Sequence, residues 1–372
     1  MKLFHLSDLH LGKRLCEVSL LDDQAYILDQ ILELVRAERP DAVLLCGDVY
    51  DKPTPPEEAV RLLDGFLVRL AELGTEVFLI SGNHDSAQRL SFGGRLMEDK
   101  GVHIAPVYRG QVASYTRCDA WGEVRFWLLP FLRCANVNQY DPDCAAKTCT
   151  EAIAAVLGKL ELDPAQRNVL LAHQFVTGAS RAESERIVVG GEDNVDLSVF
   201  APFDYVALGH LHSPQRVGQD TVRYCGTPLK YSLSEAAQQK SVTVVALGPK
   251  GEVAVSTLPL RPLRDLRPLA GSFADLIAGP ASEDYLYLTL TDETEIPEAM
   301  TRLRRIYPNA LQLRYDNTRT RRDQTVGMAE DRAPDPFAVF SELFEKQNNQ
   351  PMRAEQAAFV RALIREIWEE AE

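Results

Sequence analysis

Histidines, aspartates and one asparagine gather in five short motifs of this 372-residue sequence. In order, the motifs are Asp8-x-His10, Gly47-Asp48, Gly82-Asn83-His84-Asp85, Ala172-His173 and Gly209-His210-x-His212. Imidazole nitrogens and carboxylate oxygens together bind divalent ions of the manganese, iron and zinc type. Two such ions roughly 3.5 to 4 Å apart can activate a water for attack and clamp phosphate oxygens. The residue types therefore predict metal-assisted cleavage of a phosphoester.

Each motif follows a short apolar run that the sequence predicts to be a β-strand. The runs span residues 3–6, 42–46, 77–80, 169–172 and 205–208, and the polar candidates that follow them are Asp8, Asp48, Asn83, His173 and His210. In layered α/β folds the carboxyl ends of the strands converge on the crevice that binds the ligand. We therefore expect side chains from five distant segments to meet there. Gly47, Gly82 and Gly209 would let the backbone turn sharply beside that crevice.

The same alternation of elements predicts the fold class and the domains. Short apolar runs that alternate with helical patterns, such as residues 27–35 and 60–70, are typical of stacked β and α layers. We expect an α/β fold of the layered α+β kind. A proline-rich stretch at residues 258–262 marks a boundary. The expected parts are residues 1–260 as the catalytic domain, 261–332 as a small α/β domain with a linker, and 333–372 as C-terminal helices.

Shorter patterns fill the region after the boundary. They predict strands over residues 263–269, 285–290 and 311–315, helices over 273–277 and 297–306, and a polar linker over 317–333. In the tail, Phe337, Phe340 and Phe344 form one apolar helical face, and Val360, Ile364 and Ile367 form another. Such faces either pack on the protein itself or dock a partner, and the sequence favours neither interpretation over the other.

The composition is that of a soluble globular protein, with 45% hydrophobic and 25% charged residues. No apolar run approaches the roughly 20 residues that a membrane span needs, and the first residues lack the apolar stretch of a signal peptide. Seven cysteines without a paired CxxC pattern argue against a disulfide framework or a structural zinc site. We therefore expect a cytoplasmic protein that does not bind a membrane. Its net charge of −14 argues against tight unaided DNA binding, but not against catalysis.

Several polar residues have an ordinary structural interpretation. His5 and His103 alternate with apolar neighbours, which is typical of histidines inside a core. Asp85 is expected to support its own loop by hydrogen bonding. Arginines between residues 302 and 322 make the second part locally basic, and solvated surface arginines explain them as often as a DNA contact does.

The ordered set D-x-H, G-D, G-N-H-D, H and G-H-x-H resembles the calcineurin-like metallophosphoesterases. Longer strings at residues 4–12, 47–51, 172–176, 204–212 and 226–232 are similar to the bacterial SbcD family, the nuclease subunits of SbcCD complexes. The similarity of motifs covers residues 1 to about 245, and beyond them only the layout matches. The resemblance implies a metallophosphoesterase β-sandwich flanked by helices, a small α/β capping domain, and C-terminal helices that dock an ATPase partner.

The resemblance also implies a role for each motif residue. One ion would be held by Asp8, His10, Asp48 and His212, and the other by Asp48, Asn83, His173 and His210, so that Asp48 bridges them. His84 would contact the scissile phosphate and protonate the leaving sugar oxygen, which is a poor leaving group without a general acid. Asp51 stands where close relatives can carry a histidine that pairs with the catalytic one. We expect Asp51 to orient His84 or to touch the substrate.

The implied activity is hydrolysis of DNA phosphodiesters by two divalent ions, with Mn²⁺ as the expected metal. It acts as an exonuclease on duplex ends and as an endonuclease on single strands and hairpins. The partner that the resemblance implies is an SbcC-type coiled-coil ATPase in a DNA repair complex. This chain has no Walker P-loop, so it is not expected to bind ATP itself. A homodimer within a heterotetramer is also implied, formed through the helix at 60–70 and the segment around Leu90 and Phe92. The expected location is the nucleoid-associated cytoplasm.

Two other functions remain open at this stage. The same metal site could serve a small-molecule phosphatase or a cyclic-nucleotide phosphodiesterase, but such an enzyme would not need the long extension after Leu260. A scaffold that has lost catalysis could keep the fold, but the complete set of matched ligands argues against it.

Overall fold

The computed structural model describes residues 1–180, 194–317, 320, 336–348 and 351–369. These residues divide into two compact units. The first unit comprises residues 1–269, 280–288 and 300–313, and the second comprises residues 270–279, 289–299 and 314–372. Residues 261–332, which were expected to form a capping domain with its linker, are thus divided between the two units. None of the described helices is long and apolar enough to cross a membrane.

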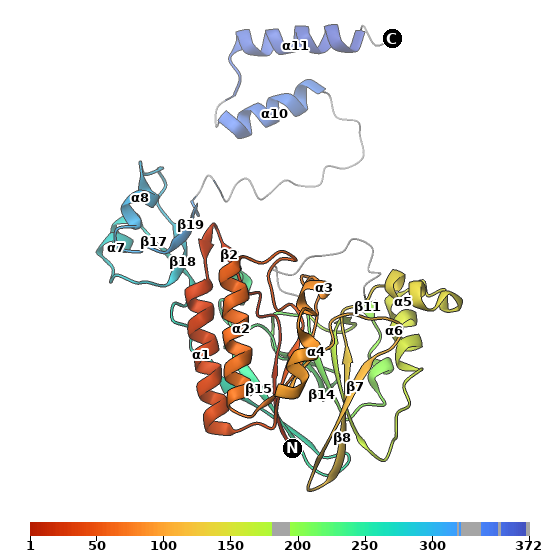
Figure 1. Ribbon diagram of the computed structural model, residues 1–372. Helices are drawn as coiled ribbons and strands as arrows, with labels where there is room; N and C mark the ends of the chain where they lie inside the picture. Colours follow the sequence, from red (N-terminus) through yellow and green to blue (C-terminus); the bar gives the residue numbers. More distant parts are fainter. Residues whose placement is uncertain (181–193, 318–319, 321–335, 349–350, 370–372) are drawn as a thin grey trace. The chain divides into compact units, whose positions relative to one another are not determined.

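Two six-stranded sheets form the centre of the first unit (Figure 1). The first sheet has the order β16-β15-β1-β4-β5-β6, with β1 at Lys2–Leu6, β4 at Ala42–Cys46, β5 at Glu76–Ile80, β6 at Val102–Ile104, β15 at Ser241–Leu247 and β16 at Val253–Pro259. The second has the order β13-β14-β12-β9-β8-β7, with β7 at Ala113–Asp119, β8 at Gly122–Leu129, β9 at Arg167–His173, β12 at Tyr205–Gly209, β13 at Gln215–Val217 and β14 at Gln219–Tyr224. All five apolar runs that precede the motifs are strands here, as the sequence predicts.

The central strands are apolar on both faces because both faces are buried. In β4, Leu44 packs into the cluster between the two sheets, whereas Val43 and Leu45 pack into the cluster on the helical side. In β12, Ala207 faces the cluster between the sheets and Val206 faces the opposite one. This alternation follows from the two-residue period of a strand. The result is the predicted α/β sandwich with helices outside it.

Helices cover the outer faces of both sheets. On the first sheet lie α1 (Leu21–Glu38) and α2 (Glu57–Glu72), which run side by side (Figure 1). On the second lie α5 (Cys134–Tyr140) and α6 (Cys149–Leu157), whose apolar residues join its outer cluster. Helix α1 ends at Glu38 because Arg39 adopts a left-handed conformation with φ 48° and Pro40 cannot continue the helix.

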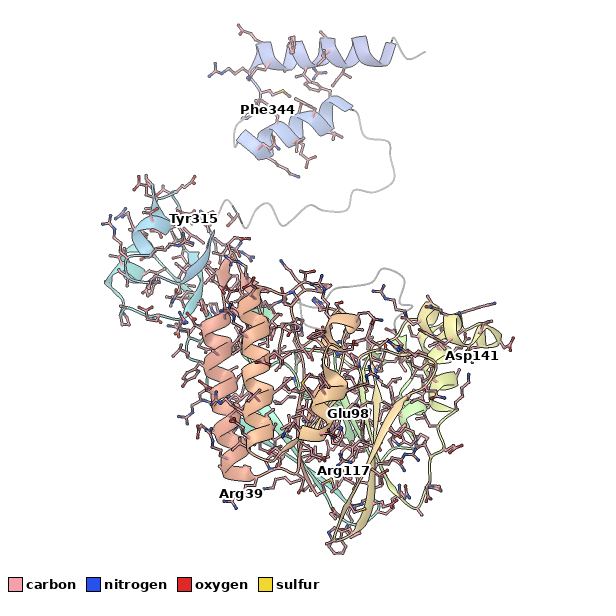
Figure 2. All side chains as sticks on the ribbon, viewed as in Figure 1. Arg39, Glu98, Arg117, Asp141, Tyr315 and Phe344 are labelled. Carbon is pink, nitrogen blue, oxygen red and sulfur yellow. The ribbon has the colours of Figure 1, made fainter. Side chains whose placement is uncertain are left out.

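An ion pair also joins the two sheets. Arg117, which projects from β7 (Figure 2), lies 2.6 Å from a carboxylate oxygen of Glu76 on β5. Arg117 also contacts Nε2 of His103, whose ring stacks on Phe78. His103 is therefore a core histidine, as the sequence predicted. His5 has the same character, since its ring nitrogens bond to Tyr205 Oη and to the carbonyl of Leu208.

Short elements complete the first unit around its sheets. They are β2 (Arg14–Leu15), β3 (Val18–Ser19), α3 (Ala87–Leu90), α4 (Gly94–Met97), β10 (Phe175–Val176) and β11 (Asn194–Val195), together with 3-10 turns at Glu98–Lys100, Pro142–Cys144, Leu197–Phe200 and Leu233–Glu235. The turn at Leu233–Glu235 lies in the segment between β14 and β15, which becomes important at the candidate site.

After β16 the chain forms a small three-stranded sheet in the order β17-β18-β19. Its elements are β17 (Leu266–Gly271), α7 (Phe273–Ala278), β18 (Tyr285–Leu290), α8 (Ala299–Leu303) and β19 (Ala310–Tyr315). The order of elements agrees with the sequence, but β17 begins three residues later and α8 is shorter than predicted. Helices α10 (Pro336–Asn348) and α11 (Ala354–Glu369) follow. Most of the expected linker at 317–333 lies outside the described residues.

Candidate metal centre

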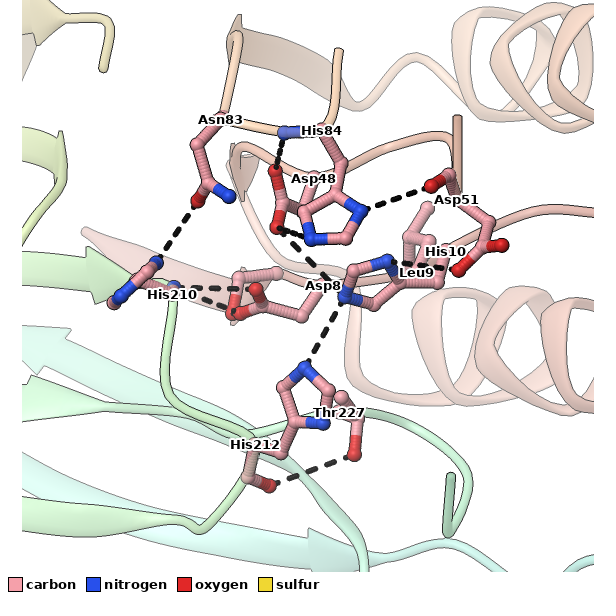
Figure 3. Close-up of polar contacts among 12 residues, drawn as sticks. Asp8, Leu9, His10, Asp48, Asp51, Asn83, His84, His210, His212 and Thr227 are labelled. Atoms are coloured by element: carbon pink, nitrogen blue, oxygen red, sulfur yellow. Dashed lines mark hydrogen bonds and ion pairs between the residues drawn. The ribbon is translucent and has the colours of Figure 1, made fainter. Parts of the chain in front are cut away.

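The motif residues lie just past the carboxyl ends of strands from both sheets. Asp8 follows β1, Asp48 follows β4, Asn83 follows β5, His173 ends β9, and His210 follows β12. Because β1, β4 and β5 run parallel to one another, as do β9 and β12, these ends come together. Figure 3 shows the resulting cluster, with side chains from distant segments facing a shared centre. The structure brings together all seven predicted metal ligands.

The backbone of this cluster is unusually constrained. Asp8, His10, Asp48 and His210 have φ angles of 53°, 44°, 47° and 106°, in a region that residues with a side chain seldom adopt. Non-glycine residues in such conformations cost free energy and are typical of functional sites. Four ligand candidates thus share a strained backbone that the surrounding packing maintains.

The glycines of the motifs serve mainly close approach rather than sharp turning. Gly47 does have a positive φ of 84°, as expected. Gly82 and Gly209 do not have a positive φ, so the predicted sharp turn is not the reason for glycine at these two positions. A Cβ atom on Gly82 would collide with the carboxylate of Asp48, and one on Gly209 would collide with the carbonyl of Cys46. Only a residue without a side chain lets these loops come so close together.

One group of donor atoms comprises Asp8, His10, Asp48 and His212. Nε2 of His10 lies 3.2 Å from Nε2 of His212 and 3.7 Å from Oδ2 of Asp48. Asp8, His10 and His212 each present a ligand atom within 4.8 Å of the others. All four side chains are buried. This is the set that the family resemblance implies for one ion.

The second group comprises Asp48, Asn83, His173 and His210. Oδ1 of Asn83 lies 3.1 Å from Nε2 of His173 and 2.9 Å from Nδ1 of His210. Nε2 of His173 is also 3.5 Å from Oδ1 of Asp48. One oxygen of Asp48 thus faces His10 and the other faces His173. The carboxylate of Asp48 lies between the two groups, where a bridging ligand would be needed.

These donors are suited to a divalent cation. Burial raises the pKa of Asp8 and lowers that of His10 well below its ordinary value, so burial disfavours the charged form of each group when no cation is bound. Although burial opposes a charge on His173, Asp48 beside it raises the pKa of His173 to about 9. Without metal, a proton thus balances the buried carboxylate. A divalent cation would replace that proton and attract every donor in both groups.

His84 lies beside the first group with a defined orientation. Its Nδ1 donates to the main-chain carbonyl of Asp51 at 2.8 Å, and its Nε2 lies 4.0 Å from Oδ2 of Asp48. Its main-chain N–H donates to Oδ1 of Asp48. Because a carbonyl only accepts, Nδ1 keeps its proton and Nε2 is the nitrogen that can exchange one.

Asp51 contacts His84 through its main chain and not through its carboxylate. The carboxylate lies 2.7 Å from Nζ of Lys13 and 3.6 Å from Nδ1 of His10. Nδ1 of His10 has no hydrogen-bond partner among the described residues. Lys13 was not identified from the sequence, although it lies close to the first motif, after Leu11 and Gly12. The main-chain carbonyl of residue 51 thus orients His84, and any residue at this position would have that carbonyl.

Asp85 supports its loop in the way that was predicted. Its carboxylate accepts hydrogen bonds from the main-chain N–H groups of Gly82, Val49 and Tyr50 at 2.9 to 3.1 Å. Burial and the nearby charge of Asp48 raise its pKa to about 6. Asp85 thereby connects the loop that carries Asn83 to the loop that carries Asp48.

Two further charged residues lie behind His212 and were missed in the sequence. Oε1 of Glu235 is 3.4 Å from Nδ1 of His212, and Oε2 of Glu235 is 2.7 Å from Nζ of Lys240. Burial opposes the charge of Glu235, but His212 and Lys240 outweigh it and hold its pKa well below its ordinary value. The pattern Ser232-x-x-Glu235 resembles a helix-capping box, which is the one signal that could have drawn attention to Glu235.

Two protein families match this chain in succession along its length. The calcineurin-like phosphoesterase family matches residues 1–214, and the type 5 capsule protein repressor C-terminal domain, a family also designated SbcD_C, matches residues 259–348. The SbcD subunits of the SbcCD nucleases of Staphylococcus saprophyticus and Staphylococcus epidermidis are each 34% identical to this chain over 321 residues. These alignments cover 84% of this chain and 84% and 85% of the relatives.

Among solved structures, a dimetal phosphatase from Danio rerio is 14% identical, with 71% of this chain and 98% of that chain covered and a TM-score of 0.43. The family matches and the identity to the two staphylococcal proteins cover most of the chain. The chain therefore belongs to the calcineurin-like phosphoesterases and, among them, to the SbcD family of nuclease subunits.

Proposed function

We propose that this chain is a DNA nuclease that holds two Mn²⁺ ions and works as the nuclease subunit of an ATPase-coupled DNA repair complex. The observation that carries the proposal is the position of Asp48, whose two carboxylate oxygens face separate groups of buried donors. The staphylococcal relatives, which are named as SbcCD nuclease subunits, support DNA as the substrate. The activities we assign are exonuclease action on duplex ends and endonuclease action on single strands and hairpins.

Each ligand candidate would have one task in this proposal. Asp8, His10, Asp48 and His212 would hold one ion, and Asp48, Asn83, His173 and His210 the other. When bound, the two ions supply Lewis-acid activation of water and neutralise the charge of the phosphate. Nδ1 of His173 donates to the carbonyl of Cys46 at 2.8 Å, so Nε2 of His173 keeps its lone pair toward Asn83 and Asp48.

His84 is the residue that moves a proton in this proposal. The carbonyl of Asp51 fixes the proton on Nδ1 and the direction of the ring. A second proton on Nε2 would be the one given to the departing sugar oxygen as the phosphodiester breaks. The side chain is partly exposed, with a relative accessibility of 24%, whereas the ligand candidates on either side of Asp48, His10 and His173, are buried. A substrate phosphate can therefore reach His84 from the solvent side.

The proposed partner is a coiled-coil ATPase of the SbcC type, and the proposed docking part is the segment 333–372. Helix α10 exposes Val339, Phe340 and Leu343, and helix α11 exposes Phe359 and Leu363. Exposed apolar side chains in helices are typical of groove-binding or helix-packing segments. In the first unit, Phe92 and Leu96 are 87% and 84% exposed, which supports a homodimer contact near α3 and α4. Two such chains would join two ATPase chains in a heterotetramer.

Degradation of linear duplex DNA tests the proposal. The protein is incubated with Mn²⁺, with and without the ATPase partner and ATP, and Asp48→Asn is measured alongside it. We expect nuclease activity that EDTA abolishes, that the partner and ATP increase on duplex DNA, and that Asp48→Asn lacks. Hydrolysis of a small bis-aryl phosphate without any DNA cleavage, even with the partner present, would instead favour the small-molecule phosphodiesterase.

A further inference from the structure

A buried carboxylate lies directly behind the ring of His212. The side chain of Glu235 has no exposed surface, and its Oε1 lies 3.4 Å from Nδ1 of His212. The opposite ring nitrogen, Nε2, lies 3.2 Å from Nε2 of His10, inside the donor cluster. Because a carboxylate can only accept, it favours the tautomer with the proton on Nδ1. The lone pair of Nε2 then points to where a cation would bind.

Lys240 holds this carboxylate and the main chain of the same histidine. Its ammonium lies 2.7 Å from Oε2 of Glu235 and 2.9 Å from the carbonyl oxygen of His212. It also bonds to Thr227 Oγ1 and Gln238 Oε1, both at 2.8 Å. The side chain of Lys240 is only 3% exposed, so a buried cation and a buried anion are balanced against each other. The pair therefore contacts His212 at both its ring and its backbone.

Further hydrogen bonds fix the position of Glu235 itself. Ser232 Oγ donates to Oε1 at 3.0 Å, and Thr227 Oγ1 contacts Oε2 at 3.2 Å while it donates to the carbonyl of Leu229. All of these groups lie in the segment between β14 and β15. The carboxylate is thus held in place from its own loop, and its distance to His212 does not depend on a flexible exposed side chain.

The geometry points to Glu235 and Lys240 as a positioning pair that sets the tautomer and direction of His212 and so strengthens cation binding by the group Asp8, His10, Asp48 and His212. This inference rests on the proposed function, because it takes His212 as a metal ligand. A carboxylate behind a ligating histidine orients the ring and makes it a better donor, and its loss costs about 10- to 100-fold in metal affinity or activity. In the other group, His173 has a neutral main-chain carbonyl in the equivalent position.

A purely structural role for the pair predicts a different result, and Glu235→Gln separates the two. The ammonium of Lys240 can only donate, so the amide oxygen of the new glutamine must face Lys240. The amide NH₂ is then turned toward Nδ1 of His212, where it favours the proton on Nε2, against the cation. The volume of the side chain is unchanged. A structural role would lower thermal stability and leave cation affinity at its wild-type value.

The experiment measures Mn²⁺ binding to the full chain without DNA, by electron paramagnetic resonance of the free ion. The matched control is Asp204→Asn, which removes a buried carboxylate from an ion pair with Lys250 at 2.7 Å. Asp204 precedes the amino end of β12, whereas His210 follows its carboxyl end. Circular dichroism and melting report the fold of each variant. We expect Glu235→Gln to bind one Mn²⁺ about 10- to 100-fold more weakly, and Asp204→Asn to bind both as the wild type does.

A double variant distinguishes a specific loss of metal binding from simple misfolding. Glu235→Leu with Lys240→Met removes both buried charges and the acceptor for Nδ1 of His212, so that no unpaired ammonium remains. We expect its fold to recover and its weak Mn²⁺ binding to persist. Wild-type affinity in either variant, within about threefold, would overturn the inference alone, since the reference effect is at least tenfold. A wild-type protein that binds no Mn²⁺ would overturn both the inference and the proposed function.

Discussion

Nδ1 of His84 donates a hydrogen bond of 2.8 Å to the main-chain carbonyl of Asp51. The bond leaves Nε2 as the reactive nitrogen and makes the orientation of His84 independent of the side chain at position 51. Nε2 lies 4.0 Å from Asp48, beside the ligand candidates, so His84 is close enough to act on a substrate held there. Variants of His84 and of Asp51 test this arrangement.

Replacement of His84 by glutamine is expected to remove proton transfer without removing the metal. General acid catalysis contributes about 10²- to 10⁴-fold to rate, and we expect a loss of that size in the rate of DNA cleavage at saturating Mn²⁺. Mn²⁺ binding measured on the same sample should stay at the wild-type level. His103→Gln is the control, since His103 packs against Phe78 outside the cluster. Loss of metal from the His84 variant would show that His84 is a ligand.

Asp51→Asn is expected to have a much smaller effect than His84→Gln. The substitution keeps the main-chain carbonyl that orients His84 and changes only the carboxylate that pairs with Lys13. Such a partly exposed ion pair contributes roughly 0 to 1 kcal/mol, which corresponds to a change in rate of less than about tenfold. Steady-state cleavage rates of the two variants check this directly. A loss for Asp51→Asn as large as that for His84→Gln would mean that the carboxylate itself takes part in the reaction.

Asp23 anchors the first turn of α1 to the start of β18. Its Oδ2 accepts from Tyr285 Oη at 2.7 Å and lies 2.9 Å from Nη2 of Arg264, while the neighbouring Gln24 donates to the carbonyl of His10 at 2.8 Å. Asp23→Asn is expected to lower the free energy of unfolding by about 1.5 to 3 kcal/mol, because hydrogen bonds to a buried charge are lost. Urea denaturation measures this loss.

Asp22→Asn, at the exposed neighbouring position, is the control for Asp23 and should change the unfolding free energy by less than about 0.5 kcal/mol. An effect of Asp23→Asn no larger than that of Asp22→Asn would contradict an anchoring role for Asp23.

The pH dependence of stability should carry a contribution from His5. Burial lowers the pKa of His5 from 6.5 to about 3 in the folded protein. Between these values the unfolded chain binds the extra proton, so folding becomes less favourable as the pH falls through 6.5. From pH 7 to pH 5.5 this effect amounts to about 1 kcal/mol. The unfolding free energy is measured by urea denaturation in EDTA at both pH values. Between pH 7 and pH 5.5, the unfolding free energy of His5→Gln should fall by about 1 kcal/mol less than that of the wild type. Equal losses would mean that His5 is already protonated in the fold.

The sequence was informative about the strands that carry the site and less informative about those at the edges. β4 and β12 are buried on both faces, so their residues form continuous apolar runs. β7, with the sequence Ala-Ser-Tyr-Thr-Arg-Cys-Asp, is an edge strand in which no residue is fully buried, and it shows no such run. β14, which lies next to the edge strand β13, has two buried residues among polar ones. Edge strands form because a neighbour offers hydrogen bonds, which a local pattern does not reveal.

The same distinction holds within the site. Ligand candidates such as Asp48 and His210 stand in short motifs after strands, and their types alone indicate their chemistry. Glu235 and Lys240 have no such motif, because each becomes informative only when the fold places it behind His212 and away from water. The close approach at Gly82 and Gly209 likewise depends on contacts between distant loops. Residues that act by positioning other residues are thus the ones that could not be identified from the sequence.

The most direct test of the whole account is the number of Mn²⁺ ions that each chain binds, measured for the wild type and for Asp48→Asn. Asp48 faces both donor groups, so we expect two ions in the wild type and a weakening of both in Asp48→Asn. Because a ligand that binds only the folded state stabilises it, Mn²⁺ at about 100 times its dissociation constant should raise the unfolding free energy of the wild type by about 2.7 kcal/mol per ion. The variant should gain much less. Two tightly bound ions in Asp48→Asn, or none in the wild type, would contradict the account.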